Sequence, residues 1–423
     1  MARNQLVLVG VNHKSAPIWL REKFHCGLDQ IKYRLSVMTG NRSGIREAVI
    51  LSTCNRIELY ALTYGNEDGQ SLLAILSDWA RTPTDELAGH VYALFDVAAA
   101  THLFAVASGL DSLILGEQQI QLQVRYASRI AKEAGASGSV LSELFQSADR
   151  SATRVRKEIG LGLNGSSVSS AAILLLSSRY PNANSVLIVG AGKMMTLAAD
   201  ELNSVEKREI LVANRTSQRA EALARHVSGA PWPYEEIPSA LERVDAVLTF
   251  TSSNDYIIKA GDISSAMRKR PNRELILIDG SVPRNIDPEA TKISGVHLYN
   301  IDDLAPFAEV QIPSNKISAG SLIIDAEVAK FFAKLRSYRA NDTLKELHQL
   351  AEEIRQTELS RAFNRMDKIS SRQKKMIDIL TRRIINKLLY EPTLRLKEHT
   401  GNGDGEAFDL IIRELFAISQ ENE

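Results

Sequence analysis

The chain has 423 residues, which is more than one compact core usually holds, so two or three domains are expected. Its 51 basic and 51 acidic residues cancel, which argues against a protein that coats nucleic acid over its whole surface. The two cysteines have no metal-ligand spacing, and no apolar run reaches the roughly 20 residues that a membrane span needs. We therefore expect a cytoplasmic protein with reduced thiols, no metal and no membrane segment.

The first third of the chain mixes strand and helix patterns. Residues 5–13 and 47–53 are apolar runs typical of buried strands, and residues 56–64 (RIELYALTY) alternate like a strand. Helical patterns lie between them, and the pattern is helical from about residue 98 to residue 158. The sequence therefore predicts an α+β domain with a helical annex over residues 1–158.

The remaining two thirds divide into two parts. After a glycine- and serine-rich linker, strands and helices alternate through residues 159–301, which indicates a doubly wound parallel sheet of Rossmann type. Residues 302–423 have apolar side chains at helical spacing and few breakers, so we predict an all-helical region. Its amphipathic faces need a partner, either within the chain or on a second copy.

The segment VLIVGAGKMM is typical of a dinucleotide-binding loop. Gly190 and Gly192 fall between a strand and a helix, where their N–H groups can approach a pyrophosphate. Met195 stands where a third glycine is usual, and we expect its side chain to push the helix outward or to fold over the loop. The alternative is a plain α/β turn. The predicted cofactor-binding residues are Gly190, Ala191, Gly192, Lys193, Met194 and Met195.

The next strand ends in Asn214, Arg215 and Thr216. A site for NAD would carry Asp or Glu here to hold the ribose hydroxyls. A guanidinium and a hydroxyl suit a ribose 2′-phosphate, so NADPH is favoured over NADH as the cofactor. The alternative is that Arg215 is a solvated loop residue.

Cys54, in LSTCNRIELYA, is a candidate nucleophile. Thiolate is the strongest common nucleophile at neutral pH, and nearby cations lower its pKa. An extended strand would place Cys54, Arg56 and Glu58 on one face, where Arg56 could stabilise the thiolate or hold a substrate carboxylate. Because buried inert cysteines are common, the residues alone do not decide between nucleophile and packing. Cys26 has no such neighbours and is expected to pack.

The chain resembles the glutamyl-tRNA reductase family nearly from end to end. The resemblance implies a catalytic domain, an NADPH domain and a helical dimerisation domain, strung along a long connecting helix in a V-shaped dimer. Of the matching blocks, STCNR and GLDSLILGE are highly specific in combination, and all blocks follow the family's order. The matching blocks are GVNHKSAPIWLREKF, LSTCNRIELY, HLFAVASGLDSLILGEQQI, LFQSADRSATRVRKE, VLIVGAGKM, ANRT, SVPRNIDP and YNIDDL.

The resemblance implies a reaction. Cys54 attacks the ester that joins glutamate to its tRNA, releases the tRNA and forms a thioester. Hydride from NADPH then reduces the thioester to glutamate-1-semialdehyde, the first step of the five-carbon route to 5-aminolevulinate, porphyrins and heme. The implied partners are glutamyl-tRNA(Glu), a second copy of the chain and the next pathway enzyme, glutamate-1-semialdehyde aminomutase.

The resemblance also implies roles for individual residues. Arg56 is implied to grip a glutamate carboxylate, and His102 to polarise the ester or assist proton transfer. Without the resemblance, His102 is interpreted as a satisfied core histidine. The implied substrate-binding residues are Thr53, Cys54, Asn55, Arg56, Ser112, Glu117, Gln118, Gln119 and Gln123.

Four positions depart from the family pattern. Gln118 replaces a proline and Leu122 a glycine in the substrate region, while Met195 replaces a glycine and Gly280 an apolar residue in the cofactor domain. None of these departures removes a chemical group. The departures at Leu122 and Met195 keep open the alternative of a catalytically impaired, reductase-like regulatory binding module, against which the intact Cys54, Arg56 and His102 argue.

A second alternative is an NADPH-dependent dehydrogenase of a small free acid, related to shikimate dehydrogenase. Such enzymes share the GAGG…NRT type of cofactor loop, but they lack an STCNR block and a long helical C-terminus. Two basic clusters, DRSATRVRKE and SRQKKMIDILTRRIINK, are candidates for contact with tRNA phosphates, with solvated helix faces as the alternative.

Overall fold

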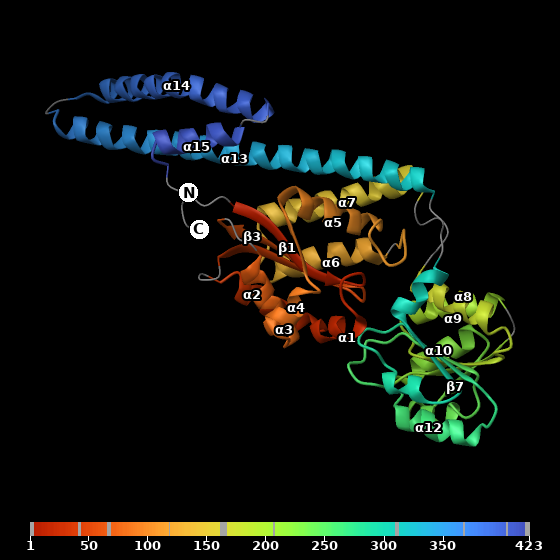
Figure 1. Ribbon diagram of the computed structural model, residues 1–423. Coiled ribbons are helices and arrows are strands. Elements are labelled where there is room, and N and C mark those ends of the chain that lie inside the picture. Colours follow the sequence, from red (N-terminus) through yellow and green to blue (C-terminus); the bar gives the residue numbers. More distant parts are fainter. Residues whose placement is uncertain are drawn as a thin grey trace. The chain divides into compact units, whose positions relative to one another are not determined.

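The structure, a computed structural model, forms two compact units, Met1–Asp325 and Ala326–Glu423. The first unit holds two β-sheets with their helices, and the second is helical (Figure 1). The predicted linker at 161–166 and the predicted substrate residue Gln118 lie outside the described residues. The structure describes residues 4–40, 44–65, 69–117, 119–160, 167–205, 208–308, 313–366, 369–402 and 405–418.

The N-terminal domain is built on an antiparallel sheet with the strand order β2-β3-β1-β4. Its central strands are buried along nearly their whole length, as strands are when helices cover both faces. The long helical stretch predicted after residue 98 is interrupted by an irregular loop at 109–117, which carries the GLDSLILGE block. The strands are β1 (Asn4–Asn12), β2 (Ile45–Ser52), β3 (Arg56–Tyr64) and β4 (Tyr92–Phe95). The helices are α1 (Ile18–Arg21), η1 (Glu22–Phe24), α2 (Leu28–Met38), α3 (Gln70–Ala80), α4 (Thr84–Ala88), α5 (Asp96–Ser108), α6 (Gln119–Glu133) and α7 (Ser139–Ile159).

The second sheet is parallel, with the strand order β10-β9-β8-β5-β6-β7, which confirms the predicted doubly wound fold. The carboxyl ends of its strands therefore meet at one edge. The strands are β5 (Ser185–Val189), β6 (Glu209–Ala213), β7 (Ala230–Trp232), β8 (Ala246–Thr249), β9 (Leu275–Asp279) and β10 (Val296–Asn300). The helices are α8 (Val168–Arg179), α9 (Lys193–Val205), α10 (Ser217–His226), η2 (Tyr234–Glu236), α11 (Ile237–Ala240), α12 (Ala260–Lys269), η3 (Pro288–Lys292) and η4 (Ile301–Phe307).

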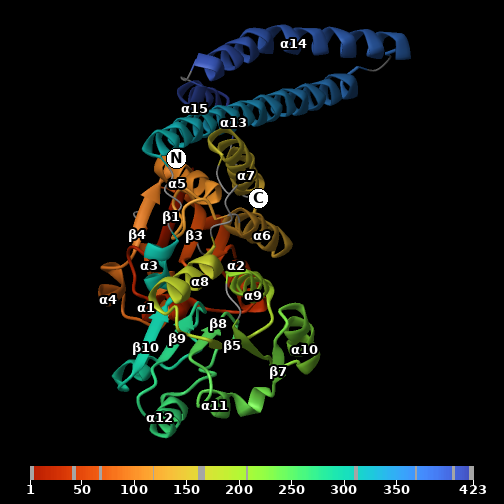
Figure 2. The ribbon, with the colours of Figure 1, turned by 90° about the vertical axis from the view of Figure 1, so that its right-hand side faces the viewer.

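Alternate residues of each strand feed two separate cores. In β5, Val186 and Ile188 pack with α8, α9 and α10, whereas Leu187 and Val189 pack with α11 and α12. Figure 2 shows α8 and α9 on one side of the strands and α11 and α12 on the other. Ile301 of η4 joins the first of these cores, so the packed part of the domain extends past residue 301.

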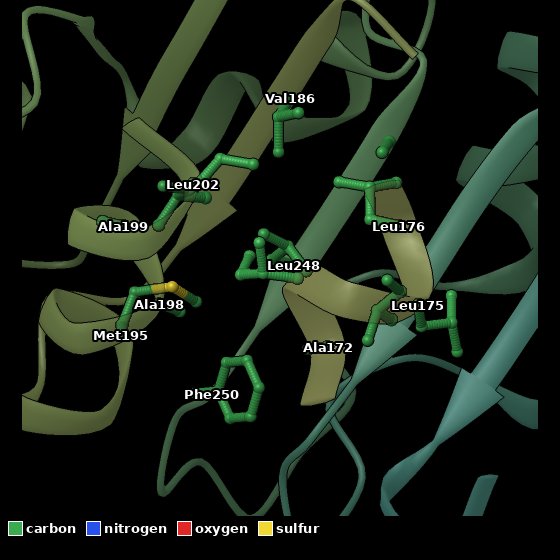
Figure 3. Close-up of a cluster of buried hydrophobic side chains, with 14 of the residues drawn as sticks. Ala172, Leu175, Leu176, Val186, Met195, Ala198, Ala199, Leu202, Leu248 and Phe250 are labelled. Atoms are coloured by element: carbon green, nitrogen blue, oxygen red, sulfur yellow. The ribbon is translucent and has the colours of Figure 1, made fainter. Parts of the chain in front are cut away.

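Met195 contributes to the first core. Its side chain is fully buried and points inward from α9, toward Leu248 and Phe250 (Figure 3). Of the two expected accommodations, the side chain folded over the loop is therefore wrong, while the outward shift of the helix stays a prediction. The methionine fills core volume, and only its backbone remains available to the cofactor loop.

Gly280 is explained by the same core. A Cβ atom built on Gly280 would lie 1.9 Å from Cε1 of Phe250, whose ring is 8% exposed. The ring of Phe250, which follows β8, thus occupies the space that a side chain after β9 would fill. The glycine at 280 thus makes room for the ring of Phe250, which comes from the end of the neighbouring strand.

The second unit is helical, as predicted. The division between the two units falls within α13 (Ser314–Asn364), which is followed by α14 (Ser371–Asn402) and α15 (Gly405–Leu415). Leu347, Leu396 and Ile412 belong to its small core. Large apolar side chains remain exposed along α14 at four-residue spacing, namely Met376, Leu380, Ile384 and Leu388. Among the described residues, every helix is too short or too polar to be a membrane-span candidate.

We predict that Gly280→Ala lowers the free energy of unfolding by about 1–3 kcal/mol, because the new methyl group overpacks the ring of Phe250. In a Phe250→Ala background the same change should cost almost nothing, since the ring is gone. Urea unfolding of the four proteins in this cycle measures the coupling. If Gly280→Ala lowers the free energy of unfolding equally in both backgrounds, the ring of Phe250 is not the reason for the glycine.

Candidate active site

Cys54 lies in the tight turn between β2 and β3. The Thr53 N–H donates to the Arg56 carbonyl at 2.9 Å, and the Thr53 hydroxyl oxygen accepts the N–H groups of Asn55 and Arg56 at 3.1 Å each. Thr53 therefore shapes the turn. The chain turns at Cys54 and is not extended there. The expectation that Cys54 shares one strand face with Arg56 and Glu58 is therefore wrong.

Arg56 and Glu58 form a buried ion pair at the start of β3. Arg56 is 1% exposed and Glu58 is fully buried, and Arg56 Nη1 donates to Glu58 Oε1 at 2.7 Å. The hydroxyls of Tyr60 and Tyr92 donate to the same carboxylate at 2.7 and 2.6 Å. Burial by itself raises the pKa of Glu58, but the Arg56 guanidinium and the hydrogen bonds outweigh it and hold that pKa well below its usual range.

His102, on α5, is bound to this pair. Its Nε2 lies 2.8 Å from Glu58 Oε1, and because an ionised carboxylate only accepts, the imidazole proton belongs on Nε2. The Nδ1 atom is then a proton acceptor, 3.8 Å from Asp111 Oδ2. His102 is therefore hydrogen-bonded, as expected of a core histidine, but it keeps one nitrogen open to chemistry.

The guanidinium of Arg56 is committed to protein partners. Besides Glu58, it donates to Asp111 Oδ2 at 3.3 Å and to the Asp111 carbonyl. The Asp111 side chain is 20% exposed and also pairs with Lys14. A substrate carboxylate that binds Arg56 through Nη1 would therefore compete with the carboxylate of Asp111.

The loop at 109–117 is held at both ends. Arg56 binds its start through Asp111, and Arg156 of α7 donates to the carbonyls of Gly116, at 2.9 Å, and Glu117. Arg156 belongs to the basic cluster DRSATRVRKE, and the bonds to this loop give it a structural role. In the same cluster, Arg150 pairs with Glu143 and Arg154 with Glu158. No local sequence pattern predicts this use of Arg156, because it depends on tertiary contacts.

Three buried polar atoms at this site have no hydrogen-bond partner among the described residues. They are Nδ1 of His13, Oδ1 of Asn55 and Oγ of Ser112. The His13 N–H donates to the Asn55 carbonyl at 2.9 Å, and Ser112 directly follows Asp111, so all three lie on segments that meet near Arg56. Buried polar atoms are normally paired, and these are open to a polar ligand.

His13 is the residue that the sequence analysis missed. Burial and the charges of Arg56 and Lys14 lower the pKa of His13 to about 4, so its ring is neutral near pH 7. The available signal was its place in the GVNHKSAP block, since a single histidine has no pattern of its own.

The Cys54 thiol is protonated in this arrangement. Burial and the nearby carboxylate of Glu117 raise the pKa of Cys54 to about 12, and the opposing charge is that of Arg21. Arg21 Nη1 donates to the Cys54 carbonyl at 2.8 Å. The expectation that nearby cations leave a thiolate is therefore wrong, because Arg56 is bound by Glu58 and burial outweighs Arg21.

The cysteine turn adjoins the predicted cofactor loop. Cys54 packs against the core that contains Met195 and Phe250. Gln119, the first residue of α6, donates through Nε2 to Met194 Sδ at 2.7 Å. Gln123 is half-buried one turn further along the same helix. Predicted substrate residues and predicted cofactor residues thus meet at the carboxyl edge of the parallel sheet.

The loop after β5 fits a dinucleotide pyrophosphate. Gly190 has φ +109° and leaves no room for a Cβ, which would lie 2.9 Å from Thr251 Cγ2. Its N–H donates to Ala213 at 2.8 Å, so it belongs to the sheet and not to a ligand. Around Gly192 the space is open, and α9 begins at Lys193. The first N–H groups of this helix have no intrahelical acceptor and suit an anion.

The end of β6 fits a phosphate as well. Arg215 is exposed and makes no hydrogen bond or ion pair within the described part of the chain. Thr216 is the N-cap of α10, and its hydroxyl makes no capping bond. Asn214 Nδ2 donates to the Thr216 carbonyl at 3.0 Å and shapes this turn. Within the described residues, no cluster of three or more His, Cys, Asp or Glu is arranged to hold a metal ion.

Comparison with known proteins places the chain in a family. Residues 9–159 match the model of the glutamyl-tRNA(Glu) reductase N-terminal domain, 176–307 that of shikimate/quinate 5-dehydrogenase, and 321–418 that of the glutamyl-tRNA(Glu) reductase dimerisation domain. A glutamyl-tRNA reductase of Syntrophotalea carbinolica is 36% identical over 99% of this chain and 95% of its own length. The chain belongs to the glutamyl-tRNA reductase family.

Other members of the glutamyl-tRNA reductase family agree. The relative from Carboxydothermus hydrogenoformans is 37% identical over 99% of this chain and 94% of its own length. The solved structure of glutamyl-tRNA reductase from Methanopyrus kandleri covers 96% of this chain and 99% of its own, with 28% identity and a TM-score of 0.51. The family assignment therefore rests on the whole chain and not on the cofactor domain alone.

We predict that Glu58→Gln destabilises the protein by about 3–5 kcal/mol, because it leaves the buried Arg56 charge unpaired. Glu158→Gln is the matched control. It breaks an exposed i,i+4 pair with Arg154 and should cost less than about 0.5 kcal/mol. Denaturant unfolding at pH 7 measures both variants, and similar small losses would contradict the importance of the buried pair.

Proposed function

We propose that the protein reduces the glutamate of glutamyl-tRNA(Glu) to glutamate-1-semialdehyde and releases the tRNA, through a thioester on Cys54. This reaction would be the first step of the five-carbon route to 5-aminolevulinate and tetrapyrroles. The observation that carries the proposal is the cluster around Arg56, with its three unpaired buried polar atoms, beside a cysteine at the edge of a dinucleotide-type sheet.

The first half-reaction uses Cys54. The sulfur attacks the ester carbonyl carbon, a C–S bond forms, and the C–O bond to the tRNA ribose breaks. The thiol proton ends on the ribose hydroxyl. Because the pKa of Cys54 is about 12 in the resting protein, this proton needs an acceptor on the way. His102, whose Nε2 proton is held by Glu58, offers Nδ1, which supports a part in proton transfer.

The glutamyl group has two charged ends to be recognised. Its carboxylate would replace that of Asp111 at Arg56, keeping the guanidinium paired. Its ammonium group carries only donors, which suits the unpaired Oδ1 of Asn55 and the acceptor nitrogen of the neutral His13. The Ser112 hydroxyl can donate or accept. Three segments of the N-terminal domain would thus converge on one amino acid.

The reductant of the proposal is NADPH, which supplies the hydride that converts the thioester to the aldehyde and frees the cysteine. The N–H groups at the start of α9 would hold its pyrophosphate, and Arg215 with Thr216 its 2′-phosphate. The contact of Gln119 with Met194 supports delivery across this edge of the sheet. Burial of Cys54 there would keep water from the thioester.

The proposal includes two protein partners. The exposed apolar side chains of α14 and the match to a dimerisation domain support a homodimer through the helical unit. A cytoplasmic location and docking of the aminomutase stay predictions from the family resemblance. The impaired-module alternative loses support because Met195 and Gly280 are accommodated by the core.

Cys54→Ser should lower semialdehyde formation by about 10³-fold or more, because a hydroxyl is a far weaker nucleophile than a thiol. Cys26→Ser is the control and should retain activity, since Cys26 lies outside the cluster around Arg56. Both variants are assayed with charged glutamyl-tRNA and NADPH. Substantial product from Cys54→Ser would overturn the thioester mechanism.

Arg215→Ala should weaken NADPH binding by about ten- to hundredfold, the equivalent of about 1.5–3 kcal/mol for a lost charge-assisted contact. NADH lacks the 2′-phosphate, so its affinity should barely change. Calorimetric titration with both cofactors gives the comparison. An equal loss for both would assign Arg215 a structural role and refute the choice of NADPH.

A further inference from the structure

Four charged residues that have no part in the proposed chemistry pair with one another near Cys54. Arg21 and Glu22 come from GVNHKSAPIWLREKF, Arg284 from SVPRNIDP and Asp302 from YNIDDL. The first two residues belong to the N-terminal domain, and the other two to the parallel-sheet domain. All four lie in one compact unit, and they form two ion pairs between its domains.

The side chain of Arg21 is fully buried and donates hydrogen bonds to three different residues. Its Nε donates to the Ala16 carbonyl at 3.2 Å, its Nη1 to the Cys54 carbonyl at 2.8 Å, and its Nη2 to Asp302 Oδ2 at 2.5 Å. Two of these acceptors are neutral carbonyls. Among the residues that the structure describes, Asp302 is therefore the only carboxylate bound to this buried cation, and it comes from the other domain.

Glu22 and Arg284 form the second pair. The Arg284 backbone N–H donates to Glu22 Oε1 at 2.6 Å, and its guanidinium donates to both carboxylate oxygens, at 2.9 and 2.8 Å. Both side chains are only 15% exposed, so water weakens the pair less than it would at the surface.

The loop that carries Arg284 is held by bonds within its own domain. The buried carboxylate of Asp279 accepts the N–H groups of Ser281, Asn285 and Ile286 at 3.1, 2.7 and 2.8 Å. These bonds hold the chain on both sides of Arg284 and do not involve the N-terminal domain. Arg284 therefore meets Glu22 with little further loss of backbone freedom.

An apolar contact lies beside the two pairs. Ile18 of α1 and Ile114 of the 109–117 loop are buried in the core of the parallel-sheet domain, together with Ile301 and Leu304 of η4. Ile301 directly precedes Asp302. The ion pairs thus lie next to a buried apolar contact. A buried charge that loses its partner there destabilises the protein strongly.

We propose that Arg21 is a positioning residue that makes the geometry of the Cys54 turn depend on docking of the cofactor domain. When Asp302 is in place, the guanidinium is neutralised and its fork holds the Cys54 carbonyl. When Asp302 leaves, Arg21 is a buried cation with only carbonyl partners, and it must rearrange toward water, which releases the turn. Docking and turn geometry therefore stabilise each other. Glu22 and Arg284 strengthen docking without touching the turn.

The first test measures Cys54 itself and needs no substrate. In a Cys26→Ser background, the rate of alkylation by iodoacetamide is compared for Arg21→Lys, Asp302→Asn and the control Glu242→Gln. The control breaks an ion pair with Lys269 inside the cofactor domain. We expect about tenfold faster alkylation in the first two variants and an unchanged rate in the control. Rates equal to the parent in both test variants, with unaltered melting temperatures, would overturn the proposal.

The second test rests on the proposed function and separates its two half-reactions. Single-turnover release of tRNA is measured without NADPH, and semialdehyde formation with it. Because weaker docking should loosen the Cys54 turn, Glu22→Gln and Arg284→Gln should slow both tRNA release and semialdehyde formation, each by less than Arg21→Lys does. The Glu22→Gln/Arg284→Gln double variant should be no worse than either single one, since neither charge is left alone.

The two tests fail in different ways. If the parent protein releases no tRNA and forms no semialdehyde, the proposed function is wrong, while the alkylation rates still decide the role of Arg21. If the parent is active and Glu22→Gln reduces semialdehyde formation but leaves tRNA release unchanged, the Cys54 turn does not depend on docking, and the proposal fails.

Discussion

The buried pair of Arg56 and Glu58 is the interaction on which the N-terminal domain depends. A guanidinium that is 1% exposed must have its charge matched inside the protein. The match requires Tyr92 from β4, His102 from α5 and Asp111 from the following loop, besides neighbours in β3. One charge on one strand thereby fixes the positions of segments up to 55 residues away. The proposed substrate pocket is the space between those segments.

This commitment has a consequence for the nucleophile. Burial and the carboxylate of Glu117 raise the pKa of Cys54 to about 12. The guanidinium of Arg56 is held by Glu58 and Asp111, so its charge is not free to stabilise a thiolate. A protonated, partly buried thiol reacts slowly with alkylating agents and oxidants. The arrangement keeps the cysteine inert until a bound ester and a proton acceptor are both present. Reactivity then depends on substrate geometry more than on a resting thiolate.

Local sequence patterns were enough for most of the fold. The apolar alternation of β3 predicted its residues, and strand–helix alternation predicted the parallel sheet, because both signals come from near neighbours. Strands β4 and β7 were missed, since edge strands of four and three residues are too short to establish a period. The residue types of the site came from motifs, but their partners did not. That Arg156 holds Glu117, or that Arg21 meets Asp302, depends on contacts that no local pattern contains.

The two departures from the family pattern in the cofactor domain are both accommodated by its packing. Met195 fills volume in the core where a glycine is usual, and the ring of Phe250 belongs to the same core. Gly280 gives up a side chain at the point where a Cβ would lie 1.9 Å from that ring. Mutually adjusted volumes are expected when packing is under selection, because an uncompensated overpacked methyl group costs about 1–3 kcal/mol. The space around Gly192 is still open to a ligand, and the guanidinium of Arg215 is still exposed and unpaired among the described residues. Both departures therefore lie in the core behind the cofactor loop, and neither blocks the surface that would meet the cofactor. This distribution is expected of a domain that still binds its cofactor, and it argues against an inactive one.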